Sequence, residues 1–271
     1  MSINDVSLTA GMRNNLVNLQ STVNLLTRTQ DRLSTGKKVN TALDDPTSFF
    51  AAQSLTSRAS DLNVLKDAMG QAVQTVKAAD AGISAISTLI EAAKGIAQSA
   101  QASAVTADRA SYAAQYDSIR DQITNLAADS GYKGTNLLNG DNLKVTFNES
   151  GSNTLTITGT TAGAGITLTA ATGAWASAAD AGLAITELGV AGTSLKASSA
   201  SLSANLSVVN TRLDFTTTMV NTLTTGADKL TLADMNEEGA NMLMLNTRNS
   251  LGTTALSLSS QAAQSVMRLF G

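Results

Sequence analysis

The fold is decided by residues 62–100, which read LNVLKDAMGQAVQTVKAADAGISAISTLIEAAKGIAQSA. Apolar residues recur there in alternating steps of three and four, at positions 62, 65, 69, 72, 76, 79, 83, 86, 90, 93, 97 and 100. Because 43% of the chain is hydrophobic, chance would produce such a run roughly 4 times in 100,000. This spacing lines one face of a helix. It predicts one long helix whose apolar seam packs against other helices.

The sequence before this helix contains a break. Residues 36–46 read GKKVNTALDDP and include the only proline of the chain. Gly36 suits the C-cap of an N-terminal helix, and Asp45 and Pro46 suit the N-cap and first residue of the next helix. The adjacent carboxylates of Asp44 and Asp45 also occur in metal or acid–base sites, but no further ligands cluster around them, so capping is the favoured interpretation.

Each end of the chain carries a further seam of apolar residues. In the N-terminal segment the seam consists of Leu16, Leu19, Val23, Leu26, Gln30 and Leu33, of which Gln30 alone is polar. A final helix from about Met235 carries on one face Leu251, Ala255, Leu258, Ala262 and Leu269. Five apolar side chains on one helix bury too little surface to offset the chain entropy lost on ordering. We therefore expect both terminal helices to be ordered by partners, and these apolar residues to form an assembly interface.

The middle of the chain changes character. A helix is expected from about Asp108 to Asp129, with Tyr112, Tyr116, Ile119, Ile123 and Leu126 on one face. Alternating residues between about 140 and 175, at 144–147, 155–158 and 166–169, predict a hairpin or a three-stranded piece, although a low-complexity linker is the alternative. Heptad-like order returns from Leu195 to Leu223 and predicts a third long helix that ends at Gly226.

These segments predict a mainly α fold. We expect a long antiparallel helical rod or coiled coil, formed by the N- and C-terminal parts, with a small β-hairpin insert in the middle. Residues 1–43 with 235–271 would form an inner coiled-coil domain. Residues 44–234 would form an outer helical rod that carries the insert at about 140–175.

Composition excludes several classes of function. The chain of 271 residues has no histidine and no cysteine, which excludes a catalytic triad, a thiolate nucleophile and a zinc finger. A net charge of −3 argues against nucleic-acid binding. No apolar run is long enough for membrane insertion, and the first residues lack a secretory signal. We expect no enzyme activity, catalytic residue, cofactor or metal.

Four motifs resemble those of bacterial flagellins. Residues 33–46, LSTGKKVNTALDDP, are similar to the N-terminal signature of the family, and residues 96–100, IAQSA, to its Ala-Val-Gln-Ser-Ala stretch. Residues 131–140, GYKGTNLLNG, resemble its Phe-Asn-Gly-x-x-Leu-Leu segment. Asn241-Met242 and the sequence LGTTAL at 251–256 resemble the C-terminal helix. The matches lie in both terminal parts, and the middle is too short for large outer domains.

The resemblance implies a subunit that self-assembles into the extracellular filament of the bacterial flagellum. Its partners would be further copies of itself, hook-associated junction and cap proteins, and a flagellar type III export apparatus with its chaperone. Export by that route needs no cleaved signal peptide. The resemblance also allows O-linked glycans on exposed Ser and Thr residues.

The resemblance also indicates one property of many flagellins that this chain is expected to lack, which is recognition by an innate receptor. In flagellins detected by the Toll-like innate receptor, the helix before Ala-Val-Gln-Ser-Ala carries Arg and Leu, at positions that align here with Glu91 and Gly95. Because a charge is reversed and a side chain is absent, the hypothesis is that this chain evades the receptor.

Other classes of protein share some of these features. A hook–filament junction protein resembles flagellin at its ends but is usually longer in the middle. A secreted coiled-coil effector or adhesin of a type III system fits the periodicity but not the terminal motifs. A metallopeptidase carried on a filament is excluded because histidine is absent. An enzyme built on carboxylates, Lys or Ser is compatible with the composition, but no spacing of these residues indicates one.

Overall fold

The computed structural model describes residues 10–160 and 168–270. It consists of helices α1 (Ala10–Thr35), α2 (Pro46–Ala102), α3 (Thr106–Asp129), α4 (Ala178–Thr231) and α5 (Met235–Phe270), a hairpin of β1 (Leu143–Thr146) and β2 (Thr154–Ile157), and the short 3-10 helix η1 (Thr172–Trp175). The chain divides into two compact units, Met1–Ser57 with Leu223–Gly271 (unit 1) and Arg58–Thr222 (unit 2). The predicted mainly α fold with a small hairpin is confirmed.

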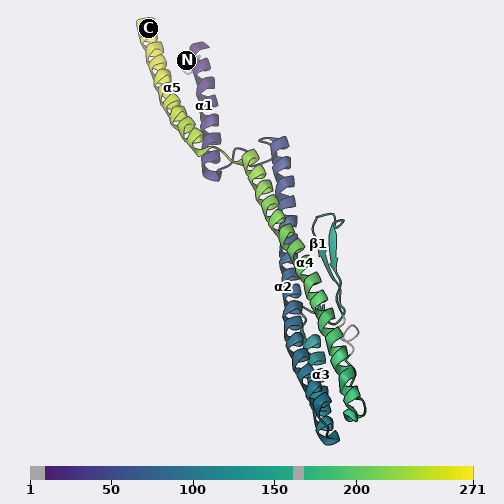
Figure 1. Ribbon diagram of the computed structural model, residues 1–271. Coiled ribbons are helices and arrows are strands. Elements are labelled where there is room, and N and C mark those ends of the chain that lie inside the picture. The colour runs from purple at the N-terminus through teal and green to yellow at the C-terminus, as the bar shows by residue number, and fades with distance from the viewer. Residues whose placement is uncertain (1–9, 161–167, 271) are drawn as a thin grey trace. The chain divides into compact units, whose positions relative to one another are not determined.

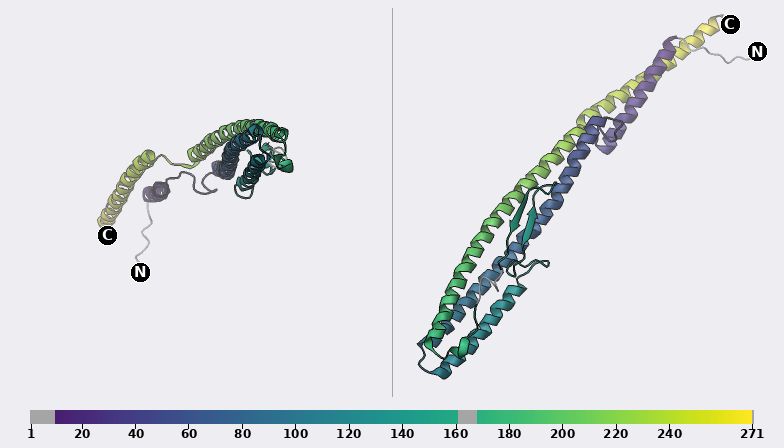
Figure 2. Two further views of the ribbon diagram at one scale, coloured as in Figure 1. Left: turned by 60° about the horizontal axis from the view of Figure 1, so that its bottom comes forward. Right: turned by 90° about the vertical axis from the view of Figure 1, so that its right-hand side faces the viewer.

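Unit 2 is built around the predicted seam of α2. Eleven of the twelve seam residues are buried and Leu65 is partly buried. The C-terminal part of α2 lies alongside α4, which runs in the opposite direction, with α3 and the hairpin packed against them (Figures 1 and 2). The alanines at 79, 93, 97 and 100 are fully buried, which allows the neighbouring backbones to approach closely.

The apolar face of α4 begins earlier than the sequence indicated. Ala181, Ala184, Leu188 and Ala191 are all buried and extend the same three-and-four spacing toward the start of the helix. The prediction that this helix ends at Gly226 is wrong, because α4 continues to Thr231. A glycine inside a helix costs about 1 kcal/mol, which is less than the burial of Leu223 and Ala227 on either side of it contributes.

The hairpin is antiparallel and pairs Leu143 with Ile157 and Val145 with Leu155. These four side chains lie on one face, and Val145 and Ile157 are buried in the core of unit 2. The predicted hairpin is therefore confirmed between residues 143 and 157, and the alternative of a low-complexity linker is wrong there. The third expected strand is not formed at 168–169, and its residues 166–167 lie outside the described residues.

Candidate assembly surfaces

The terminal helices α1 and α5 pack side by side in unit 1 and run in opposite directions (Figures 1 and 2). On α1 the buried or partly buried side chains include Met12, Leu16, Leu19, Leu26, Thr29 and Leu33. On α5 they include Glu238, Met242, Leu245, Asn249, Gly252 and Leu256. Both sets follow steps of three, four or seven, so one stripe of each helix is used within the subunit.

A glycine allows the two helices to approach closely. A Cβ atom at position 252 would lie 2.9 Å from Leu19 Cδ1, closer than real Cβ contacts occur. Gly239, on the same helix, has open space in the corresponding direction. A side chain at position 252 would therefore require the end of the Leu19 side chain to move.

The segments that follow α1 and precede α5 are tied together by backbone hydrogen bonds. Lys37 and Leu232 form an antiparallel bridge. The amide of Lys38 donates to the Thr231 carbonyl at 2.8 Å, and the amide of Ala233 donates to the Gly36 carbonyl at 2.9 Å. Gly36 has a φ of 71°, a conformation that glycine adopts without strain, so the predicted C-cap is confirmed.

The acidic pair in the turn before α2 has a structural role. Asp45 accepts hydrogen bonds from the Thr47 and Ser48 amides and from the Ser48 hydroxyl, as predicted for an N-cap. Hydrogen bonds from Ser48 lower the pKa of Asp45. Asp44 accepts from the Asn40 and Thr41 amides, at 3.0 and 2.9 Å, and from the Thr41 hydroxyl. These bonds, chiefly that from the Thr41 amide, lower the pKa of Asp44.

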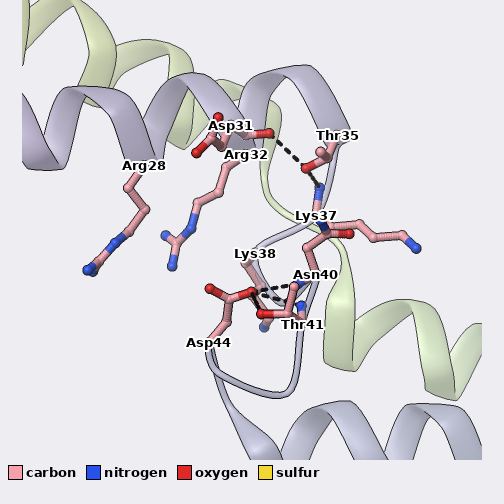
Figure 3. A pocket seen from close by; sticks show the side chains of 9 residues that line it. All are labelled: Arg28, Asp31, Arg32, Thr35, Lys37, Lys38, Asn40, Thr41 and Asp44. Carbon is pink, nitrogen blue, oxygen red and sulfur yellow. Dashed lines mark hydrogen bonds between the residues drawn. The ribbon is translucent and has the colours of Figure 1, made fainter.

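A pocket of about 280 Å³ lies between the end of α1 and this turn. Figure 3 shows the residues that line it, which are Arg28, Asp31, Arg32, Thr35, Lys37, Lys38, Asn40, Thr41 and Asp44. Four of them are cationic and two are acidic. This pocket was not predicted from the sequence, although the pair Lys37-Lys38 follows two arginines that lie one helical turn apart.

The structure places the predicted interface residues on two different kinds of surface. Leu16, Leu19, Leu26 and Leu33 lie partly buried on α1, whereas Val23 is 43% exposed. On α5 the predicted face points away from α1: Leu251 is 65% and Leu258 61% exposed, and Ala255 and Ala262 are exposed. The side chain of Leu269 lies outside the described residues.

The α5 face that packs on α1 was missed in the sequence. Met242, Leu245, Asn249, Gly252 and Leu256 repeat in steps of three and four, but two members are not apolar. The α5 helix thus carries two stripes, one covered within the subunit and one open.

Within residues 10–160 and 168–270, no group of three or more Asp or Glu side chains is placed to hold a metal ion. Among the helices described, none combines the length and hydropathy needed to cross a lipid bilayer.

Comparison with known proteins identifies the family. Residues 3–143 match the bacterial flagellin N-terminal helical region. Flagellin FljM of Caulobacter vibrioides is 31% identical over 276 residues, and the alignment covers the whole of both chains. The chain belongs to the bacterial flagellins. Flagellin FljK of the same organism is also 31% identical over the full length of both chains, and a Brucella melitensis flagellin is 29% identical over 94% of this chain and 95% of its own.

A solved structure agrees on the fold. The crystal structure of Bacillus cereus flagellin matches 55% of this chain and 88% of its own with a TM-score of 0.50, at 19% identity. As a flagellin, the chain is a structural subunit that self-assembles into the filament of the bacterial flagellum, outside the cell. It is not an enzyme.

Proposed function

We propose that this flagellin assembles through the open stripe of α5, formed by Leu251, Ala255, Leu258 and Ala262, with Leu269 as a further predicted contact. The α1 seam residues Leu16, Leu19, Val23, Leu26 and Leu33 would contribute the surface that α5 leaves uncovered. The observation that carries this proposal is the exposure of Leu251 and Leu258, at 65% and 61%, while the opposite stripe of the same helix packs on α1. Exposed leucines at heptad spacing are suited to pack against another helix.

The inner part of the filament would be residues 1–43 with 235–271, and residues 44–234 would form the outer rod. Elongation would be driven by burial, because each leucine removed from water contributes about 1.5 to 3 kcal/mol. The α1–α5 pair alone buries few large side chains, among which Met12 and Leu245 are the only apolar ones below a tenth exposed in the described part of these two helices. The two helices would therefore gain most of their order on incorporation.

Substitution of the open stripe tests this proposal. Leu251→Gln with Leu258→Gln should raise the critical concentration for seeded polymerisation about a hundredfold or more. The matched control is Leu183→Gln with Val190→Gln, which changes two equally exposed apolar residues of unit 2. Unaltered polymerisation of the α5 variant would contradict the proposal, as would equal loss in the control.

Deletion of residues 235–271 supplies a second test. The truncated chain should stay soluble and keep the helical content of unit 2, because the core of unit 2 contains no residue of α5. It should not add to seeds. Filaments formed by the truncated chain would show that α5 is dispensable for assembly.

We also infer the partners that a flagellin needs before and after assembly. Export unfolded through the flagellar type III apparatus with a chaperone, without a cleaved signal peptide, suits a subunit whose terminal helices order late. Junction and cap proteins would contact the two ends of the filament. Exposed Ser and Thr residues are candidates for O-linked glycans, which the intact mass of subunits from native filaments would reveal.

Evasion of the Toll-like innate receptor is the remaining proposal. Glu91 and Gly95 are both exposed on α2, so the Glu91 carboxylate and the bare backbone at Gly95 would face a contacting protein. A carboxylate and a missing side chain would oppose a contact made by Arg and Leu. Purified monomer should give little reporter activation, and Glu91→Arg with Gly95→Leu should increase it; strong activation by the unaltered monomer would refute the hypothesis.

A further inference from the structure

The pocket at the end of α1 contains three cations that form no salt bridge with the described residues. Arg32 forms an ion pair with Glu238, but among the described residues no carboxylate lies within salt-bridge distance of Arg28, Lys37 or Lys38. Figure 3 shows the Arg28 and Arg32 guanidinium groups on one side of α1 and the Asp31 carboxylate on the other. Lys38 contributes to the lowered pKa of Asp45 and Arg32 to that of Asp44, so the positive charge on this side of the pocket is only partly compensated.

The charges already present do not explain the cluster. The C-terminal end of a helix carries about half a negative charge and favours one nearby cation. The Asp44 carboxylate faces the pocket, but its Oδ2 atom accepts three hydrogen bonds from the turn at Asn40 and Thr41. A further anion would be attracted by Arg28 and Lys38 and would complete the site.

An exposed apolar residue beside the pocket indicates that the anion belongs to a protein. Leu43 is 96% exposed, and it lies in the turn that Asp44 fixes through its hydrogen bonds to Asn40 and Thr41. A free inorganic anion has no apolar surface to pack against Leu43. A protein surface that packs on Leu43 removes it from water, which favours binding. A self-assembling chain supplies such a surface from its own copies.

The charge distribution of the chain indicates which part of a second copy fits. Acidic and basic residues balance in Met1–Ser57 with Leu223–Gly271. The whole net charge of −3 therefore resides in Arg58–Thr222. A basic pocket on unit 1 and an acidic unit 2 are complementary surfaces for a head-to-tail contact, which a helical filament requires.

We propose that the pocket between α1 and the turn at 40–45 receives a carboxylate from unit 2 of a second copy, and that Leu43 packs on the same copy. This rests on the proposed assembly through the terminal helices, because it adds a polar contact to the same polymer. Arg28 and Lys38 bind the carboxylate, and Leu43 excludes water from one side of it. The contact selects the register between copies, since a misplaced copy leaves both the cations and the leucine uncovered.

Cross-linking of mixed-isotope filaments tests the contact directly. Equal amounts of ordinary and ¹⁵N-labelled subunits are copolymerised and treated with a carbodiimide, which joins a lysine amine to a carboxylate in contact with it. Mass spectrometry should find Lys37 or Lys38 joined to an acidic residue of Arg58–Thr222, in pairs that carry both isotopes. Lys37 and Lys38 joined only within one copy, or unreacted while other lysines react between copies, would overturn the proposal.

Charge reversal separates this proposal from the one it rests on. Arg28→Glu with Lys38→Glu should raise the critical concentration at least about tenfold, whereas Lys77→Glu with Lys144→Glu makes the same charge change on exposed residues of unit 2 and should have a smaller effect. Circular dichroism checks that both variants keep the helical content of the unaltered chain. Leu43→Ser, which changes no charge, should weaken assembly in the same direction.

The results distinguish the possible failures. If the Leu251 and Leu258 variant fails to polymerise while the Arg28 and Lys38 variant assembles normally, the pocket has no part in assembly and only this proposal falls. Normal assembly of both variants would refute both proposals. Millimolar inorganic phosphate is then added to the unaltered chain. If the mixed-isotope cross-links persist, the occupant of the pocket is the carboxylate of a second copy. If phosphate abolishes the cross-links while assembly continues, the pocket is a site for a free anion and the proposal falls.

Discussion

Arg32 Nη1 lies 2.8 Å from Glu238 Oε1 and joins the last turn of α1 to the first turn of α5. The Glu238 side chain is 8% exposed and that of Arg32 is 35% exposed. Burying a carboxylate this deeply is costly unless a cation or several hydrogen-bond donors accompany it. The pair therefore fixes the relative position of two helices that lie 206 residues apart in sequence.

The first prediction concerns this ion pair. Glu238→Ala should weaken the α1–α5 packing by about 1 to 3 kcal/mol, because the Arg32 guanidinium would lose its partner at a partly covered position. In a double-mutant cycle with Arg32→Ala, the coupling free energy should be about 1 kcal/mol. The measurement is the temperature of thermal filament disassembly, with the exposed neighbour Glu237→Ala as control; additive effects of the two substitutions would argue against coupling.

The second prediction concerns the close approach at Gly252. Gly252→Leu should disturb the α1–α5 packing, because its Cβ atom would already displace Leu19 Cδ1, 2.9 Å away, and the rest of the leucine side chain would need further space. The expected loss is about 1 to 3 kcal/mol, and Leu19→Ala in the same chain should recover part of it. Gly239→Ala, where space is open, should instead stabilise the helix by about 0.5 to 1 kcal/mol. Thermal disassembly that ranks these variants otherwise would refute the packing.

The third prediction concerns a buried arginine of unit 2. Arg109 donates to the carbonyl oxygens of Trp175, Ala176 and Ser103, at 3.1, 2.7 and 2.9 Å. Arg109→Met should lower the free energy of unfolding by about 2 to 3 kcal/mol, since buried acceptors would be left unpaired. Trp175 is 1% exposed and is the only tryptophan, so its fluorescence should shift to the red.

The control for this experiment is Arg120→Met. Arg120 pairs with Asp117 and Asp121 at the surface, and loss of such pairs costs about 0 to 1 kcal/mol. Denaturant unfolding of the full-length monomer measures both variants. Equal stability of the two, with unchanged tryptophan emission in the Arg109 variant, would show that the arginine does not fix this segment.

The fourth prediction concerns alkaline pH. Burial, followed by the nearby Glu187 carboxylate, raises the pKa of Tyr116 from 10.0 to about 12. Because the pKa is raised in the folded state, the protonated Tyr116 hydroxyl favours folding. This contribution to the free energy of unfolding is fully present below pH 10 and is lost as the pH rises toward about 12. Tyr116→Phe should reduce this loss of stability between pH 10 and about 12. Denaturant unfolding across that range checks it, and an identical alkaline loss in both proteins would contradict the assignment.

Much of unit 2 followed from the sequence. Twelve regularly spaced apolar residues between 62 and 100 predicted the buried face of α2, because a repeat of three and four can be buried only on a helix. The caps at Gly36 and Asp45 were equally local, since each depends on the conformation or hydrogen bonds of a few neighbouring residues. The prediction failed at Gly226, where a local signal for helix ending is weaker than the packing of the adjacent Leu223 and Ala227.

The proposed assembly surfaces follow partly from the sequence and partly from the tertiary structure. The sequence by itself determined that α5 carries apolar residues at Leu251 and Leu258, and its motifs indicated the family. Only the tertiary structure decided which stripe of α5 packs on α1, because a helix with two possible stripes is assigned a face by the partner that meets it. The same reason applies to the basic pocket: Arg28 and Lys38 are brought together by the turn after Gly36, a relationship that depends on how the chain folds back and not on spacing along it.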